Sequence, residues 1–248
     1  MLAHELTHTI QQGAIRNPLL SKRNLVKGES VQTGVVQGQT KISAGGIHKV
    51  QRQSGLPNAS QMVQCPNNEL TAAITTARTW ATQSYPVITS LTAKVQAGNI
   101  NNLTSREQYA RQELLNMFQI EISNPAHVNH LLYVMNIATF LHSIMRTLNP
   151  NDFRCVTQQY SECGPFWQAE AFVTGRLPVY LCITAFQSQT APGRAHTVLH
   201  EVAHVAGAMG HPEIYSPICS PYVLGAASTL DALENADHYA CLLRVLRL

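Results

Sequence analysis

The sequence lacks several features that would narrow its class. No apolar run approaches the roughly 20 residues of a membrane-spanning helix, so we expect no membrane span. Its first residues do not form a basic stretch followed by an apolar one, so we expect no Sec-type signal peptide. The six cysteines include no Cys-x-x-Cys pair, which argues against a zinc–thiolate site. Their even number leaves two alternatives open, either up to three disulfides in an oxidising compartment or six buried free thiols.

Aromatic residues are absent from the start of the chain, since the first Phe, Tyr or Trp is Trp80. Residues 1–64 are rich in Gln, Gly, Ser and Thr and carry seven basic against two acidic side chains, whereas the remainder carries 10 basic and 12 acidic. Such a segment cannot bury enough apolar surface to offset the entropy of ordering it, so we predict that residues 13–64 are a disordered linker. A basic segment can also bind nucleic acid or an anionic membrane. However, we expect no nucleic-acid partner, because no aromatic side chains on which bases could stack interleave with these charges.

From Asn67 onward the chain has the periodicity of a folded domain, which we place at residues 65–248. A first helix should start near Glu69 and be interrupted around Pro86. Further helices are predicted over residues 104–118, 124–150, 192–210 and 227–248. Short β-branched or aromatic segments bounded by Gly and Pro predict strands at residues 153–156, 170–175 and 178–186. The expected fold class is α+β, mainly helical, with a small β-sheet.

The pattern His-Glu-x-x-His occurs twice, at residues 4–8 and 200–204. A shuffled chain of this composition would hold roughly 0.02 copies, so composition alone does not explain two. In the second copy, His200 and His204 project from one face of a helix, and neutral imidazole is a good ligand for Zn²⁺. Glu201 would act as the general base that takes a proton from the attacking water in metal-dependent hydrolysis. Small and branched apolar residues surround the pair and would keep the site dry.

The alternative for this second copy is a buried helix with incidental histidines. Glu201 argues against it, because a carboxylate on an otherwise apolar helix is costly to bury without a charged partner. His196, one turn earlier, is expected to be only a surface residue of the first turn. His127, His130 and His142 share the helix predicted at 124–150, where no carboxylate or cysteine joins them at ligand spacing, so we interpret them as structural.

A third zinc ligand has three candidates, which are His211, Glu213 and Asp237. The metzincin spacing requires a histidine one residue before His211, so that imidazole should point elsewhere. Asp237 lies on the last predicted helix in line with apolar residues and should be buried. A buried carboxylate requires a metal, a hydrogen-bond network or a cationic ligand.

Residues 172–239 resemble the deuterolysin and lysine-specific metalloendopeptidase family, the aspzincins. The resemblance lies in "PVYLCITAF", which is similar to a family strand, in "TVLHEVAH", which is similar to the zinc helix, and in "NADHY". It implies a zincin-like metallopeptidase domain with Zn²⁺ as cofactor. The family's third ligand is an Asp, and Glu213 stands at the corresponding spacing, nine residues after His204.

The same resemblance assigns two further roles. The family's oxyanion-binding tyrosine should stand where this chain has Ser216, and Tyr215, one residue earlier, is the candidate for that role. The family's acidic residue that binds a substrate lysine maps onto Asp237. For Asp237 two interpretations are open, a carboxylate for a cationic substrate side chain or a structural hydrogen-bond acceptor.

The first copy of the motif lies in "LAHELTHTIQQ", and residues 1–13 resemble the closing helix of a domain found on toxins of extracellular contractile injection systems. Most of that domain should precede the motif, so we expect residues 1–12 to be a remnant helix of an upstream domain. "KVQRQ" at residues 49–53 is similar to the linkers that follow such domains. Whether His4, Glu5 and His8 bind metal is left open, because no third ligand follows in the Gln-rich leader.

These observations lead to one main hypothesis and two rivals. The main hypothesis is a monomeric zinc metalloendopeptidase, acting on protein or peptide substrates with lysine as the favoured side chain. It would be a secreted or injected effector or toxin domain. The first rival is a catalytically degenerate zincin that serves as a binding or injection-system loading module. The second is an esterase or amidase that uses the same zinc site on small molecules.

Overall fold

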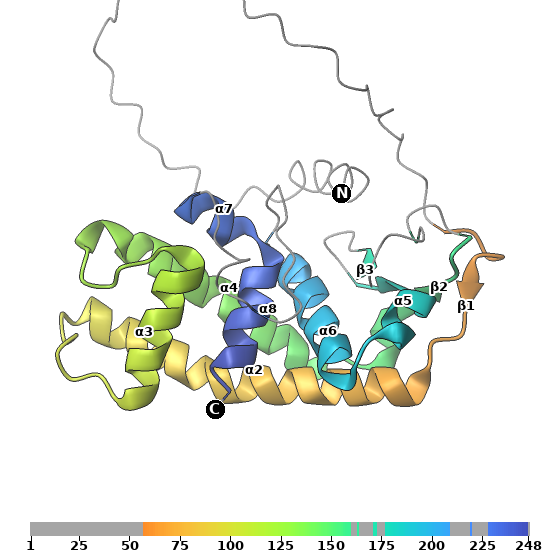
Figure 1. Cartoon of the computed structure of the whole chain (residues 1–248), viewed down its shortest axis with the longest axis horizontal. Helices are drawn as coiled ribbons and strands as arrows, with labels where there is room; N and C mark the ends of the chain where they lie inside the picture. The colour runs from red at the N-terminus through yellow and green to blue at the C-terminus, as the bar shows by residue number, and fades with distance from the viewer. Residues whose placement is uncertain are drawn as a thin grey trace, which may run out of the picture.

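The computed structural model describes residues 57–159, 163, 171–172, 177–208, 219 and 228–247. Within this part, helices dominate and a small sheet lies at one end (Figure 1). The helices are α2 Asn67–Gln96, α3 Ser105–Phe118, α4 Val128–Thr147, α5 Ile183–Ser188, α6 Ala191–Ala206, α7 Thr229–Glu234 and α8 Ala236–Val245, with 3-10 turns at Pro125–His127 and Pro150–Asp152. The strands are β1 Met62–Val63, β2 Phe153–Val156, β3 Ala171–Phe172 and β4 Val179–Cys182. The predicted mainly helical α+β class is confirmed.

Helix α2 is the longest helix described, and four other helices pack against it. It runs along the lower edge of the molecule in Figure 1 and contacts α3, α4, α6 and α8. Its buried residues recur every three or four positions, from Leu70 through Ala77 and Ser84 to Leu91 and Val95. This spacing places one continuous stripe of apolar side chains against the rest of the core.

The interruption predicted at Pro86 is wrong, because α2 continues through this residue to Gln96. Proline cannot donate a hydrogen bond to the carbonyl of Thr82, which normally costs about 3 kcal/mol in a helix interior. Pro86 and Thr82 both lie on the exposed side, where water can bind the freed carbonyl. The buried side chains that follow, Val87 and Ile88, contribute the packing that holds the helix together.

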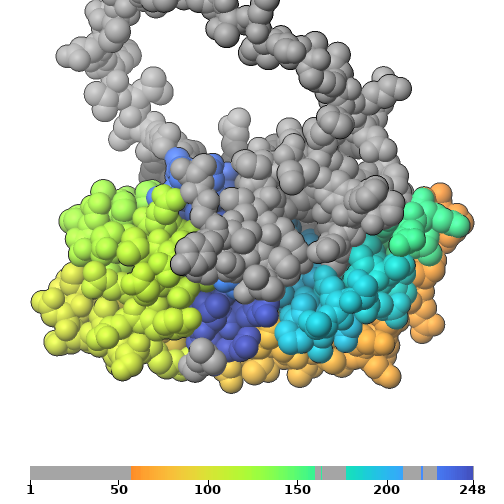
Figure 2. Space-filling view, in the orientation of Figure 1, coloured from red at the N-terminus to blue at the C-terminus, as the bar shows by residue number. Residues whose placement is uncertain are grey.

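Helix α6 lies at the centre of the fold and packs against α2, α4 and α8. Every residue from Ala195 to His204 is buried, as expected for a helix covered on all sides. The prediction that His196 is a surface residue is wrong. The helix begins at Ala191, so His196 falls in its second turn, beneath α8. Figure 2 shows α6 and α8 meeting between the α3 side of the molecule and the sheet side.

The sheet has four strands in the order β1-β2-β4-β3. The two central strands are parallel, with Phe153 opposite Val179, and both edge strands are antiparallel to their neighbours. Strand β1 lies inside the segment predicted to be disordered up to residue 64, so order begins earlier than expected. In β1, the backbone of Met62 pairs with that of Val156 in β2. Two residues after β1, Cys65 forms a disulfide with Cys155 of β2.

The third predicted strand, residues 178–186, ends early, because the chain turns into α5 after Cys182. Cys182 and Phe186 are both buried and lie four residues apart, which is helical spacing. Short apolar runs do not distinguish a strand from a buried helix by periodicity alone, and here tertiary packing decides.

All six cysteines form disulfides, which confirms one of the two alternatives left open by the sequence. The pairs are Cys65–Cys155, Cys163–Cys182 and Cys219–Cys241. The first two connect parts of the sheet region, and the third joins α8 to Cys219. Among the described residues, none of the helices combines the length and the hydropathy of a membrane-spanning segment.

Candidate metal centre

Helix α6 brings His200, Glu201 and His204 together in a buried group whose ligand atoms all lie within 4.8 Å of one another. The two imidazole rings are nearly perpendicular, at 86°, with their Nε2 atoms 3.2 Å apart. The nearer carboxylate oxygen of Glu201 is 3.7 Å from Nε2 of His200. The spacing of four residues on a helix accounts for this convergence, as the sequence predicted. This group could hold a metal ion.

Hydrogen bonds at the opposite ring edges define the tautomers of the two histidines. His204 donates from Nδ1 to the carbonyl of Ala208 at 2.7 Å, since a carbonyl oxygen only accepts. His200 donates from Nδ1 to the ionised carboxylate of Asp237 at 3.2 Å. In a neutral imidazole with its proton on Nδ1, Nε2 carries a lone pair. The two lone pairs are therefore directed at the same small volume.

Two nitrogen lone pairs 3.2 Å apart require a positive charge between them, either a shared proton or a metal ion. Tetrahedral zinc binds histidine nitrogens at about 2.0–2.1 Å, which separates two such ligands by about 3.3 Å. The observed spacing fits that geometry. The oxygen acceptors behind both rings are the usual partners of metal-bound histidines, because they fix the tautomer and raise the basicity of the ligand.

Glu201 is only 1% exposed, and it is the one acidic residue of α6. Burying a carboxylate costs several kcal/mol unless a positive charge or hydrogen bonds compensate. A cation between His200 and His204 would lie close to this carboxylate and supply that compensation. The alternative of incidental histidines on a buried helix does not explain why the carboxylate and both lone pairs face the same place.

Asp237 is fully buried, as predicted, and connects α8 to α6. Its Oδ1 accepts from His196 Nε2 at 2.6 Å and from His200 Nδ1 at 3.2 Å. Burial raises the pKa of the Asp237 carboxyl. The charge of His196 and the hydrogen bonds from both histidines lower it by more than burial raises it, so the pKa lies well below its ordinary range. Asn235 caps α8 by accepting from the Asp237 backbone N–H at 2.9 Å, so the Asn-Ala-Asp spacing orients the carboxylate.

This position bears on the two interpretations of Asp237. Its carboxylate lies at the Nδ1 edge of His200, the edge opposite to the one that faces His204. A carboxylate there supports the ligand from behind rather than joining it as a third ligand. The arrangement supports the interpretation as a structural hydrogen-bond acceptor, and the contact with a substrate lysine stays a prediction.

His196 is the residue of the candidate site that the sequence analysis misplaced. It is fully buried, and its Nε2 makes the shortest of the hydrogen bonds to Asp237. The sequence did contain a clue, because His196 precedes His200 by the same four residues that separate His200 from His204. Residues at this spacing share one face of a helix, so His196 had to lie on the same side of α6 as His200 and His204.

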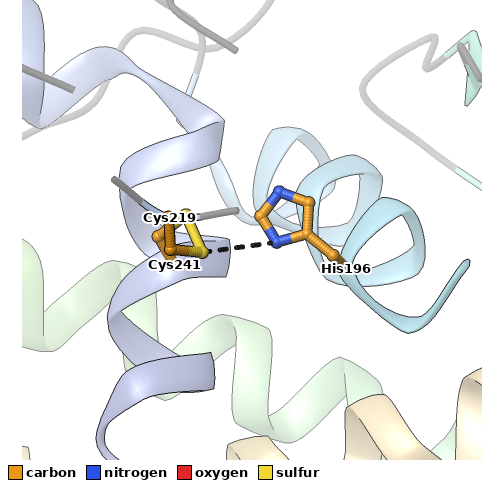
Figure 3. A group of neighbouring side chains, drawn as sticks. All are labelled: His196, Cys219 and Cys241. Carbon is orange, nitrogen blue, oxygen red and sulfur yellow. Dashed lines mark hydrogen bonds between the residues drawn. A yellow bond between two sulfur atoms is a disulfide. The ribbon is translucent and has the colours of Figure 1, made fainter. Parts of the chain in front are cut away.

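Cys219 and Cys241 lie beside His196 and form a second group of potential ligands (Figure 3). The two sulfurs are bonded to each other, so neither is a thiolate available to a metal. Instead the disulfide contacts the site, with Cys219 Sγ 3.9 Å from His196 Nδ1 and Cys241 Sγ 4.0 Å from Asp237 Oδ2.

Several other predicted residues lie outside the described residues or away from the centre. Glu213, His211 and Tyr215 are outside the described part of the chain, and so are His4, Glu5 and His8. The ring of His127 accepts from the backbone N–H of Glu121 at 2.9 Å. His142 stacks on Tyr85 with ring centroids 4.4 Å apart. These contacts agree with the structural interpretation of both histidines.

Comparisons with known proteins do not identify the chain. No protein-family model, no curated protein and no solved structure matches it.

Proposed function

We propose that this chain is a zinc-dependent metallohydrolase of the zincin type that cleaves peptide bonds. The observation that carries the proposal is the convergence of two Nε2 lone pairs, 3.2 Å apart, beside the buried carboxylate of Glu201. A structural metal site would require ligands but no additional carboxylate next to them. A base beside two imidazole ligands is the arrangement used in metal-assisted hydrolysis.

The residues have distinct roles in this proposal. His200 and His204 would hold zinc through their Nε2 atoms, with Asp237 and the Ala208 carbonyl fixing the two rings. When bound, zinc supplies Lewis acidity to a carbonyl and to a water molecule. Glu201 takes a proton from the attacking water and returns it to the leaving amine. Its burial keeps water and salt from screening the carboxylate.

The remaining roles rest on the resemblance to aspzincins. Glu213 is proposed as the third ligand and Tyr215 as the oxyanion-binding residue. The position of Asp237 behind His200 does not support a preference for lysine, so the proposed substrate class is a peptide without a stated sequence. The three disulfides are typical of proteins that work in an oxidising compartment, which supports export of the domain. Delivery as a toxin by a contractile injection system rests on the N-terminal resemblance alone.

The proposal is tested with the purified full-length chain, loaded with zinc and incubated with a mixed peptide library. We expect about one equivalent of bound zinc and cleavage of extended peptides. His204→Ala should lose both zinc and cleavage, because it removes a ligand. Glu201→Gln should keep zinc but lose at least about 100-fold in the cleavage rate, because only the base is changed.

A matched control is His142→Ala, which removes a histidine that stacks on Tyr85 and belongs to neither group of potential ligands. It should retain zinc and activity. Bound zinc in His204→Ala at the wild-type level would contradict the ligand assignment. Zinc binding without cleavage of any peptide would favour a degenerate zincin that serves as a binding module, whereas hydrolysis of small amides alone would favour an amidase.

A further inference from the structure

We propose that His196 is a positioning residue of the metal centre, which acts on the ligand His200 through the carboxylate of Asp237. This inference rests on the proposed function, since it assumes that His200 binds metal. Asp237 Oδ1 accepts one hydrogen bond from His196 Nε2 and another from His200 Nδ1. The three buried side chains therefore form one hydrogen-bonded series. These hydrogen bonds connect the proposed ligand His200 to a histidine whose Nε2 faces Asp237.

Of the two hydrogen bonds that Asp237 Oδ1 accepts, the one from His196 is the shorter. Its Nε2 lies 2.6 Å from Asp237 Oδ1, whereas the contact from His200 is 3.2 Å. A hydrogen bond to an ionised carboxylate is short and strong when the site is dry, and all three side chains are buried. His196 therefore determines where the carboxylate lies, and the carboxylate in turn orients the ring of His200.

The donation by His196 does not depend on its protonation state. Its Nε2 carries the proton in the neutral tautomer that the contact with Asp237 selects, and it also does so in the imidazolium form. Loss of this donor would remove the shorter of the two hydrogen bonds that Asp237 Oδ1 accepts from the imidazoles. The ring of His200 would then be held less firmly, and its Nε2 would no longer face His204 in a single orientation.

The Cys219–Cys241 disulfide packs against the hydrogen-bonded pair of His196 and Asp237. In Figure 3 the ring of His196 points to the bond between Cys219 and Cys241. Cys219 Sγ lies 3.9 Å from His196 Nδ1, and Cys241 Sγ lies 4.0 Å from Asp237 Oδ2. Both members of the hydrogen-bonded pair therefore rest against the same covalent crosslink, which limits the freedom of the His196 ring.

The test measures zinc affinity of the full chain by competition with a chromophoric chelator, together with the visible absorption spectrum after cobalt substitution. His196→Ala should weaken zinc binding by about 10- to 100-fold and alter the cobalt spectrum, as expected for removal of a partner behind a ligand. His196→Gln should restore most of the affinity, because its side-chain amide can donate to Asp237. Thr197→Val is the matched control, since Thr197 is buried on the same helix but donates to Gln189 instead.

A double variant separates positioning from a general loss of stability. If His196 acts through Asp237, then His196→Ala should have no further effect on zinc affinity once Asp237→Ala is present. Additive losses would overturn the proposal, and so would unchanged zinc affinity in His196→Ala or a failure of His196→Gln to restore it. If the alanine variants do not fold, the comparison of His196→Gln with the wild type decides. Failure of the proposed function itself looks different, since the wild-type chain would then either bind no zinc or bind zinc and cleave no peptide.

Discussion

At the scale of single residues, Glu107 shows how a charge is stabilised in this core. It is 3% exposed, yet Lys94 Nζ donates to it at 2.6 Å and Ser90 Oγ donates at 2.6 Å. The same carboxylate accepts from the backbone N–H of Thr104, which completes a capping box at the start of α3. The hydrogen bonds from Lys94 and Ser90 are the main causes that lower the pKa of Glu107 from 4.5 to about 2.

Glu107→Gln should lower the free energy of unfolding at pH 7 by about 1–3 kcal/mol, because hydrogen bonds to a charged group are lost. A carboxyl whose folded pKa is depressed stabilises the fold above its unfolded pKa of 4.5, and this contribution disappears as the pH falls toward about 2. Urea unfolding at pH 7 and at pH 2.5 measures the effect. The difference between variant and wild type should shrink at the lower pH.

The control for this prediction is Glu69→Gln, which changes an acidic residue in the first turn of α2. It should change the free energy of unfolding at pH 7 by less than about 0.5 kcal/mol. A Glu107→Gln difference that stays constant from pH 7 to pH 2.5 would show that the carboxylate charge does not stabilise the fold.

At the scale of secondary-structure elements, the C-terminal end of α6 contacts a histidine of the candidate metal centre. Gly207 adopts a φ of +110°, and the next backbone N–H, that of Ala208, donates to the Ala203 carbonyl at 3.0 Å. This reversal is typical of glycine-terminated helices. It brings the Ala208 carbonyl back onto His204 Nδ1 at 2.7 Å. The helix cap and the support of a proposed ligand are therefore the same piece of backbone.

Gly207→Ala should destabilise the fold by about 1–2 kcal/mol, because a side chain is strained at positive φ. It should also weaken zinc binding, since relief of the strain would move the Ala208 carbonyl away from His204. Gly98→Ala is the matched control, because Gly98 has a φ of +69° at the end of α2 with open space around it. Both variants should lose stability in urea unfolding, but zinc competition should separate them.

At the scale of the whole molecule, two disulfides of similar span have different positions. Cys219–Cys241 spans 22 residues and touches His196 and Asp237, whereas Cys163–Cys182 spans 19 residues and packs beside Val156 near the sheet. A crosslink that closes a loop of this length stabilises a protein by about 3 kcal/mol in the chain-entropy description. The two bonds should therefore contribute similar stability but have different effects on the metal centre.

Replacing both cysteines of a pair by serine should lower the free energy of unfolding by a similar amount for either disulfide. Only the Cys219→Ser, Cys241→Ser variant should also weaken zinc binding, because it removes the support behind His196 and Asp237. Equal zinc affinities in the two double variants would show that the disulfide contact has no part in holding the site.

The sequence by itself determined what depends on spacing along one helix. Because the α-helix repeats every 3.6 residues, His200 and His204 had to face the same side, with Glu201 beside them. Capping residues and apolar periodicity likewise predicted the mainly helical class and most of the helices, but the single helix predicted at residues 227–248 is wrong, because the chain divides at Asn235 into α7 and α8. His196 was predictable in principle from the same period, because it precedes His200 by four residues, but it was interpreted as a surface residue of the first turn, whereas it is fully buried in the second.

Only the tertiary structure decided which distant residues meet. The contact between His196 and Asp237 joins positions 41 residues apart, and the pairing of six cysteines has many arrangements that local spacing cannot rank. The passage of α2 through Pro86 and the change from strand to helix after Cys182 also depended on what packs against each segment. Local backbone preferences are worth up to about 1 kcal/mol for most residues and about 3 kcal/mol for a proline inside a helix, and the burial of several side chains in the assembled core outweighs them.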